Sequence, residues 1–293
     1  MINPIAFSLG PINVYWYGVI FAVAILLATY LTDFEGQRVG LPKGIFFELA
    51  LFVVPTAILF ARIYYVIFHL EEYVAKPFSV FAIWQGGLAI HGSIIGGLLS
   101  TYLFSKFKKI SFLKLTDVIV PNLLLAQAIG RWGNFINQEA YGSAVDKAFL
   151  TSFHLPTWVI SQMNISGIFH HPTFLYESLW DLLGFVFLVT LRYTKGIKLG
   201  EITAFYFMFY SVGRFFIEGF RMDSLAFFGP KWLEETLLFL WSPLSKYFAQ
   251  GVLVGGNIRV AQVVSLILFI FFFGFFIYLR FKKKVPYYNL GEN

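Results

Sequence analysis

Long apolar stretches dominate the hydrophobic pattern of the chain. Seven stretches of about 20 residues contain few charged side chains, and about 20 apolar residues are needed to cross a bilayer as a helix. The pattern therefore predicts an all-α integral membrane protein with seven transmembrane helices. They lie near residues 14–32, 48–68, 85–104, 117–136, 174–191, 201–218 and 260–280.

Two connections between these stretches are long, approximately 137–173 and 219–259, and the others are short. Long loops are where a membrane enzyme places elements that handle substrate. The second one is rich in Trp, Phe and Leu, which suits a segment lying in the membrane interface or, equally, a folded cap outside the membrane. We find no internal repeat and no soluble domain, so we expect one membrane-embedded domain over residues 1–293.

Composition supports a membrane protein. Hydrophobic residues make up 58% of the chain and charged residues 13%, whereas soluble domains have about 45–50% and about 25%. This balance excludes an ordinary soluble enzyme and a disordered chain. The chain also contains no cysteine, which excludes disulfides, thiolate metal sites and a cysteine nucleophile of its own. A thiol carried by a substrate is not excluded.

The basic residues predict the topology. Of the 22 Lys and Arg residues, 13 lie in one alternate set of connections and in the C-terminal tail, and 5 lie in the other set. Positive charge accumulates on the cytoplasmic side, so we expect the N-terminus outside and the C-terminus in the cytoplasm, with both long loops extracytoplasmic. The first basic residue is Arg38, so the first stretch does not resemble a cleaved signal peptide. The net charge of +6 is carried by Lys and Arg residues that lie mostly at the predicted membrane edges. It therefore does not indicate nucleic-acid binding.

Polar stripes run along two of the predicted spans. The first contains Gln127, Arg131, Asn134 and Gln138, and the second contains Tyr210, Arg214, Glu218 and Arg221. Residues spaced by three or four positions share one helix face. Ionisable side chains are costly inside a membrane and usually face protein or water.

The arginines of these stripes indicate an anion site. Arg214 and Glu218 are four positions apart and can neutralise each other. Arg131 has no acid at three or four positions on its own helix, so a purely structural role would need a partner from another helix. Guanidinium groups bind phosphate with a planar fork of donors. We therefore predict a phosphate-binding cavity in the outer half of the spans.

His91 follows Gly86 and Gly87 in a glycine-rich segment. Its near-neutral pKa makes it a candidate general base, although a hydrogen-bonded core histidine is an equally good interpretation. Gly92 and Gly96 are spaced for close helix packing, and we expect packing roles for Gly96 and Gly97. No acid or second histidine stands at ligand spacing, so a metal site is not expected.

Several other polar residues have two interpretations. His170 and His171 resemble half a metal site, but hydrogen bonding within a loop is the favoured role. Glu177 and Asp181 share a helix face and are suited to oppose an arginine from a neighbouring helix. Arg62 is suited to reach the membrane edge or to pair with one of these acids.

One segment carries a family signature. Residues 130–142 read G-R-W-G-N-F-I-N-Q-E-A-Y-G and meet every fixed position of the pattern G-R-x-G-N-F-x-N-x-E-x-x-G. The chain resembles the bacterial phosphatidylglycerol–prolipoprotein diacylglyceryl transferases, and the resemblance covers almost its whole length. It includes Trp16-Tyr17-Gly18, His91-Gly92, His171 to Glu177 and Gly213-Arg214-Phe215.

The resemblance implies an activity. Members of this family move the diacylglyceryl group of phosphatidylglycerol onto the thiol of the lipobox cysteine of a prolipoprotein, and glycerol 1-phosphate leaves. It implies a multi-pass protein of the bacterial cytoplasmic (inner) membrane, with the active site opening to the extracytoplasmic side. Its partners are phosphatidylglycerol, prolipoprotein signal peptides and the bilayer. No metal or organic cofactor is expected.

The resemblance also implies roles for individual residues. Those implied in catalysis are His91, Arg131, Arg214 and Tyr17. Those implied in binding phosphatidylglycerol are Arg131, Asn134, Tyr210, Arg214, Glu139 and Gly142, and those in a supporting or gating role are Glu218, Arg221 and Asp117. Ser93 departs from the family, which commonly has a second glycine after the histidine, so a role that requires glycine flexibility there is in doubt.

The main alternative is a transporter or flippase for an anionic lipid or an organic phosphate. Paired arginines within a membrane would serve that function equally well. Such a protein is expected to show internal repeats with helices broken at matching places, and no such repeat is found.

Overall fold

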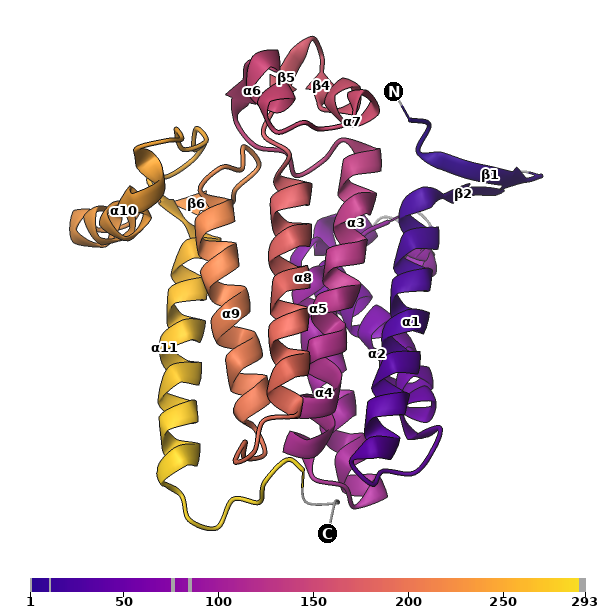
Figure 1. Ribbon diagram of the computed structural model, residues 1–293. Helices are drawn as coiled ribbons and strands as arrows, with labels where there is room; N and C mark the ends of the chain where they lie inside the picture. The colour runs from indigo at the N-terminus through magenta and orange to yellow at the C-terminus, as the bar shows by residue number, and fades with distance from the viewer. Residues whose placement is uncertain (1, 11, 75–76, 84–85, 290–293) are drawn as a thin grey trace. The chain divides into compact units, whose positions relative to one another are not determined.

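The computed structural model describes residues 2–10, 12–74, 77–83 and 86–289, and it is mostly helical (Figure 1). The chain divides into two compact units. The first unit contains residues 2–28 and 120–289, and the second contains residues 29–119. The division falls within helices α1 (Trp16–Arg38) and α5 (Phe112–Asn137).

Long helices occupy all the predicted spans. They are α1, α2 (Ile45–Phe68), α4 (Ile90–Lys108), α5, α8 (Thr173–Arg192), α9 (Glu201–Glu218) and α11 (Val260–Phe281). The third starts later than expected: its predicted first residue, Gln85, lies outside the described residues, and Gly86 and Gly87 have φ of 90° and 71°. Such backbone is incompatible with a right-handed helix.

Five of these helices are long and apolar enough to cross a membrane, namely α1, α2, α5, α8 and α11. The other two fall short in composition. Helix α4 is diluted by Gly, Ser and Thr, and α9 carries Glu201, Arg214 and Glu218 within 18 residues. The structure therefore supports a mostly helical protein with five candidate spans.

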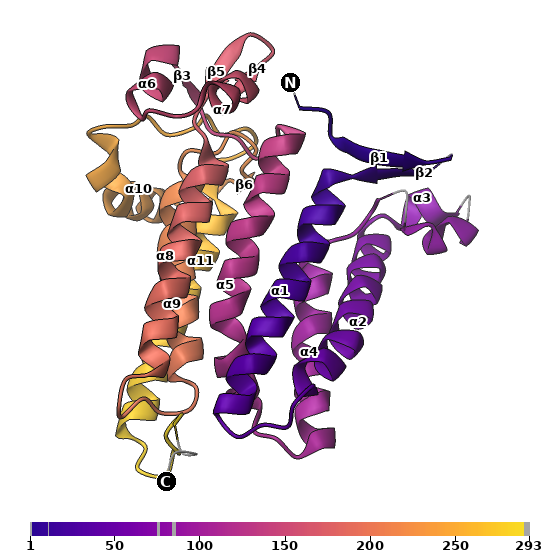
Figure 2. The same ribbon diagram turned by 45° about the vertical axis from the view of Figure 1, so that its right-hand side comes forward.

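Helices α8, α9 and α11 lie side by side in the first unit (Figures 1 and 2). Glycines permit the close approach of α8 to α9. A Cβ atom on Gly213 would lie 2.2 Å from the Trp180 ring, and one on Gly184 would lie 2.6 Å from the Phe209 ring. Trp180 also donates a hydrogen bond from Nε1 to the Phe209 carbonyl at 3.0 Å. These contacts fix α9, which carries Arg214, against α8.

The connection between α5 and α8 folds into a small cap at one end of these helices (Figure 1). It contains α6 (Lys147–Ser152), α7 (Thr157–Gln162) and an antiparallel sheet in the order β3-β5-β4. The strands are β3 (Ala144–Val145), β4 (Asn164–Ile165) and β5 (Ile168–His170). Phe135 of α5 and Phe174 of α8 share one apolar cluster with Leu150 of the cap. The cap is thereby attached to the ends of both helices.

The connection between α9 and α11 contains α10 (Lys231–Ser245), flanked by the antiparallel strands β6 (Ala226–Phe227) and β7 (Ile258–Arg259). Trp241 of α10 is 1% exposed and donates from Nε1 to the Phe216 carbonyl at 3.0 Å. A Cβ atom on Gly219 would lie 2.2 Å from that indole. Trp241 therefore holds α10 against the C-terminal end of α9.

The second unit is built on the packing of α2 against α4. A Cβ atom on Gly92 would lie 2.2 Å from the Phe60 carbonyl oxygen, and one on Gly96 would lie 2.7 Å from Phe60 Cβ. The packing role predicted for Gly96 is confirmed. The prediction is wrong for Gly97, where an added Cβ would meet only Val53, at 4.0 Å.

Arg62 stabilises the segment that precedes α4. It is buried and donates to the carbonyls of Ser79, Val80, Gly86 and Gly87 at 2.6–3.0 Å. Helix α3 (Leu70–Val74) and a 3₁₀ helix (Pro77–Phe81) belong to the same connection. Arg62 thus forms no ion pair with a described acid, because backbone carbonyls take its donors.

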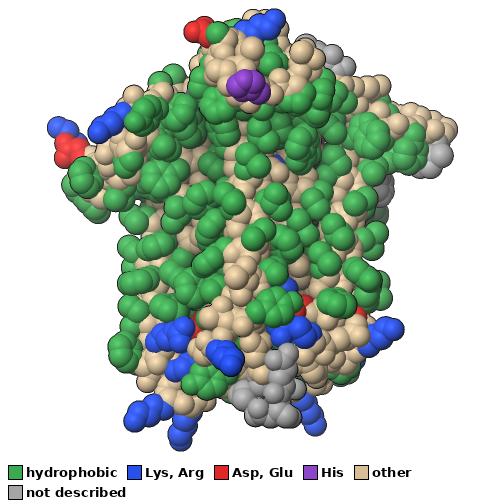
Figure 3. Space-filling model, viewed as in Figure 1, with side chains coloured by type: hydrophobic (Ala, Val, Ile, Leu, Met, Phe, Trp, Pro, Cys, Tyr) green, Lys and Arg blue, Asp and Glu red, His purple; other side chains and the backbone are tan. Residues whose placement is uncertain are grey.

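A hairpin of β1 (Ile5–Leu9) and β2 (Ile12–Tyr15) precedes α1. All described strands are short and lie outside the long helices, so the helical fold class holds. On the face in Figure 3, hydrophobic side chains cover the middle of the helices, and Lys and Arg gather near the end of α11. The sequence there contains Arg280 and three exposed lysines, Lys282 to Lys284.

Candidate functional site

Glu177 connects three arginines in the first unit. Its carboxylate lies 2.6 Å from Arg131 Nε, 3.0 Å from Arg214 Nη1 and 3.9 Å from Arg221 Nη1. These residues come from α8, from α5, from α9 and from the segment after α9. The partner that Arg131 lacks on its own helix is therefore supplied by α8, as the shared face of Glu177 and Asp181 suggested.

Glu218 forms a second contact point for two of these arginines. Its Oε2 lies 2.7 Å from Arg214 Nη2 and 3.9 Å from Arg221 Nε. The pairing of Arg214 with Glu218 on one helix is confirmed. Arg214 is thus held by two carboxylates, one on each side of its fork, which orients the guanidinium.

Exposure differs between the cations and the anions of this cluster. The side chains of Arg131 and Arg214 are 21% and 20% exposed, whereas those of Glu177 and Glu218 are 9% and 3% exposed. The arginines are therefore the more accessible members of this cluster. An incoming anion would therefore meet guanidinium groups before it met a carboxylate.

Arg221 has a further partner, Asp223, at 2.7 Å and 2.9 Å from its guanidinium nitrogens. Burial alone would lower the pKa of Arg221, but the hydrogen bonds and charge of Asp223 outweigh it and raise the pKa. The same contacts hold the pKa of Asp223 below its ordinary value against the opposing effect of burial. Arg221 is therefore a fixed positive charge at the end of α9.

Tyr17 lies against the signature helix. A Cβ atom on Gly133 would lie 2.5 Å from the Tyr17 ring, so this ring covers the helix between Arg131 and Asn134. Tyr17 remains 40% exposed. The glycine at position 133 is explained by this contact, which the spacing of the motif did not reveal.

The rest of the signature forms the turn that ends α5. Asn134 Nδ2 donates to Glu139 Oε1 at 3.0 Å, and the Glu139 amide donates to the Asn134 carbonyl, also at 3.0 Å. Gln138 and Ala140 have φ of 53° and 58°, a conformation that non-glycine residues rarely adopt. Asn134 and Glu139 are therefore hydrogen-bonded to each other, and these bonds stabilise a turn with strained backbone.

Gly142 joins the cap to the end of α9. Its amide donates to the His171 carbonyl at 3.1 Å, and an added Cβ would lie 2.6 Å from His171 Cβ. Gly142 also pairs with Arg221 as an antiparallel bridge. The position therefore requires glycine for close approach, and it helps to place Arg221.

The paired histidines belong to this junction. His170 Nδ1 lies 2.8 Å from the Gly142 carbonyl oxygen, and His171 Nδ1 lies 3.1 Å from the Tyr176 hydroxyl. Burial, with the charge of His170, lowers the pKa of His171 to about 4. The loop hydrogen-bonding role is confirmed.

Three predicted residues remain, namely Tyr210, His91 and Asp117. Tyr210 stands one turn before Arg214 and stacks on Tyr206, with ring centroids 6.1 Å apart. His91 and Asp117 are in the second unit. His91 is exposed in the first turn of α4 and stacks on Tyr64 at 5.7 Å, and Asp117 is fully buried near the start of α5.

Ser93 lies within the helical part of α4, where its amide donates to the Ala89 carbonyl at 3.2 Å. Helical backbone does not require glycine, so serine fits at this position.

Glu177 is the functional candidate that sequence reasoning left out of the site. The signal for it was its place on the face shared with Asp181.

Known proteins of one family are similar to this chain over most of its length. The family model for prolipoprotein diacylglyceryl transferase matches residues 4–278. A relative from Bacillus licheniformis is 47% identical over 283 residues, covering 97% of this chain and 94% of that protein. A relative from Listeria welshimeri is 44% identical and covers 98% and 93%, and one from Bacillus cereus is 50% identical and covers 80% and 87%. All three are named phosphatidylglycerol–prolipoprotein diacylglyceryl transferase. The chain belongs to the prolipoprotein diacylglyceryl transferase family.

Proposed function

We propose that this protein transfers the diacylglyceryl group of phosphatidylglycerol to the thiol of the lipobox cysteine of a prolipoprotein. The product is a thioether, and glycerol 1-phosphate is released. One observation carries the proposal: in a chain of this family, Arg131, Arg214 and Arg221 converge on Glu177 and are more exposed than that carboxylate. The names of the relatives supply the two substrates.

The protein is a multi-pass membrane protein, and we infer seven spans acting as one transferase domain in the bacterial inner membrane. Helices α4 and α9, of 19 and 18 residues, would add to the five apolar ones. The distribution of Lys and Arg supports an outer N-terminus and a cytoplasmic C-terminus. In that orientation the cap, α10 and the arginine cluster face the extracytoplasmic side.

The proposed reaction is a substitution at the glycerol carbon that carries the phosphate ester. The thiol proton passes to a base, the sulfur forms a bond to that carbon, and the carbon–oxygen bond to phosphate breaks. The departing oxygen keeps the electron pair, so negative charge grows on the phosphate. Fixed guanidinium groups stabilise such charge without reorganising at the moment of reaction.

Arg131 and Arg214 are assigned to the phosphate. Both are oriented by buried carboxylates and both retain exposed surface. Tyr17, Asn134 and Tyr210 are assigned to orienting the lipid head group, while Glu139 and Gly142 shape the turn beside it. Glu218 and Arg221 support Arg214 and the mouth of the site. Asp117, buried near the start of α5, is assigned a supporting role there.

His91 is the proposed base, because its side chain is exposed and imidazole is a common general base. Lowering of the thiol pKa by arginine charge alone would serve the same purpose. We expect His91→Gln to lower the transfer rate at pH values below the ordinary thiol pKa of about 8.5, where little thiolate forms without a base. Transfer rates equal to those of the wild type at every pH would rule out the histidine as base.

A reconstituted assay tests the function. Purified protein, phosphatidylglycerol vesicles and a lipobox peptide should yield a peptide whose mass increases by one diacylglyceryl group on cysteine. A peptide with Cys→Ser should gain no mass, because the hydroxyl is a far weaker nucleophile than the thiolate. Absence of product with folded protein, or equal modification of the serine peptide, would contradict the proposal. The names of the relatives do not favour the transporter alternative.

A further inference from the structure

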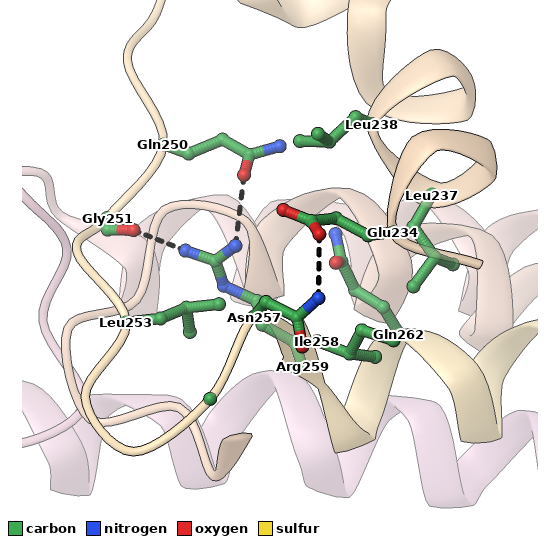
Figure 4. Close-up of a pocket in the computed structure, with 11 residues that line it drawn as sticks. Glu234, Leu237, Leu238, Gln250, Gly251, Leu253, Asn257, Ile258, Arg259 and Gln262 are labelled. Atoms are coloured by element: carbon green, nitrogen blue, oxygen red, sulfur yellow. Dashed lines mark hydrogen bonds between the residues drawn. The ribbon is translucent and has the colours of Figure 1, made fainter. Parts of the chain in front are cut away.

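A separate pocket lies between α10 and the start of α11, and it shares no residue with the Glu177 cluster. Its volume is about 340 Å³, at the small end of the range for sites that bind small molecules. Figure 4 shows its polar lining, which includes Glu234, Gln250, Asn257 and Arg259. The pocket therefore has room for a compact polar molecule or head group.

Arg259 is the unusual feature of this pocket. It is 3% exposed, and no carboxylate of the described residues lies within 4 Å of it as an ion-pair partner. Nη1 donates to Gln250 Oε1 at 3.0 Å and Nη2 donates to the Gly251 carbonyl, while Nε has no hydrogen-bond partner among the described residues. Burial lowers the pKa of Arg259, and the charge of Glu218 offsets this effect only in part. A buried charge that is not fully compensated is costly, so an anionic ligand would be stabilised here.

Two more features define the ligand. Arg259 is the N-cap of α11, which has 22 residues and no side-chain cap hydrogen bond, so the helix end adds partial positive charge. Glu234 also lines the pocket, and its Oε2 accepts from Asn257 Nδ2 at 2.6 Å. This carboxylate would repel a bare anion but would accept hydrogen bonds from hydroxyl groups.

We propose that this pocket binds a phosphate ester that carries free hydroxyl groups, such as a glycerol phosphate group. The phosphate lies on the Arg259 guanidinium and beside the Gln250 amide, and the hydroxyls face Glu234 and Asn257. This chemistry has two sources, a soluble glycerol phosphate or the head group of a glycerol-bearing anionic lipid.

Calorimetric titration of the purified full chain with glycerol 1-phosphate tests the soluble source. An Arg214→Gln background weakens binding at the Glu177 cluster, so the remaining binding reports this pocket. Arg259→Gln should weaken that binding about tenfold or more. Leu253→Trp should do the same by filling the pocket while it keeps Arg259. Lys231→Gln, an exposed change on α10 outside the lining, should have no effect.

Native mass spectrometry after addition of phosphatidylglycerol tests the lipid source. If the head group is the ligand, Arg259→Gln and Leu253→Trp should each retain one lipid fewer than the Lys231→Gln control. Loss of soluble-ester binding alone assigns the pocket to a soluble ligand. Unchanged binding of both ligands in folded Arg259→Gln and Leu253→Trp proteins would overturn the proposal.

Discussion

At the scale of single residues, Glu177 decides what the arginines can do. Without it, Arg131 would be a cation in an apolar helix with no acid at helical spacing. With it, the nitrogens of Arg131 and Arg214 lie 2.6 Å and 3.0 Å from one carboxylate. Charge-assisted contacts of this kind fix the direction of a guanidinium fork. The fork geometry, more than the charge, should therefore matter for function.

Replacement of Arg214 tests that distinction. Arg214→Lys keeps the positive charge but cannot contact Glu177, Glu218 and a phosphate at once. We expect the transfer rate to fall by about a hundredfold or more, measured with the lipobox peptide. The exposed Lys246→Arg change should leave the rate unaltered. Wild-type turnover by Arg214→Lys would refute the phosphate assignment.

His171 gives a prediction for stability. Because burial and the charge of His170 lower its pKa from 6.5 to about 4, the unfolded chain binds a proton in this pH window that the folded chain does not. The free energy of unfolding should therefore fall as pH drops from about 6.5 to about 4. In His171→Gln the fall in melting temperature over this range should be shallower. His154→Asn, at an exposed histidine, should keep the wild-type slope, and equal slopes in all three proteins would contradict the assignment.

At the scale of elements, glycines set how closely helices approach. Gly92 and Gly96 bring α4 onto the backbone of α2, and Gly133 brings the Tyr17 ring onto α5. Helices in membranes associate through packing of this kind, because lipid provides no hydrophobic driving force between them. Spacing alone does not identify which glycine makes the contact, as Gly97 shows.

Gly92 and Gly97 form a matched pair for measurement. Gly92→Ala would place a methyl group 2.2 Å from the Phe60 carbonyl oxygen, so the helices must separate. We expect a loss of about 1–3 kcal/mol in the free energy of unfolding. Gly97→Ala would meet only an ordinary contact at 4.0 Å and should be close to neutral. Thermal unfolding in detergent distinguishes them, and equal destabilisation would show that α2–α4 packing does not depend on Gly92.

At the scale of the whole molecule, topology in the membrane follows from where the basic residues lie. Lysines crowd the segment after α11, while the cap between α5 and α8 has few. In the orientation proposed from the rule that positive loops stay in the cytoplasm, the cap lies outside. The absence of cysteine from the chain makes this directly measurable.

Single cysteines report the two sides. Lys147→Cys, in the cap, should react with a membrane-impermeant maleimide in intact cells. Lys283→Cys, after α11, should react only once the membrane is opened. Both positions are exposed, so a failure to label is not caused by burial. Labelling of Lys283→Cys in intact cells would reverse the proposed orientation.

Much of the fold was predictable because its signals are local. Apolar stretches and the helical period predicted seven long helices close to their observed bounds, and α9 matches its predicted range of 201–218. The late start of α4 was missed because it depends on positive φ at Gly86 and Gly87. The secondary structure of the two long connections could not be predicted either, because short strands and the 15-residue helix α10 give little periodic signal.

The sequence by itself determined that this is a helical membrane protein with arginine stripes on two helices and a family signature, because spacing along one helix fixes which residues share a face. Only the tertiary structure decided that Glu177 joins those stripes, that Tyr17 covers Gly133, and that Arg259 is buried beside a pocket next to α10. These contacts join residues far apart in the chain. Their formation depends on helix packing and on the cost of leaving a buried charge unpaired, which no local pattern records.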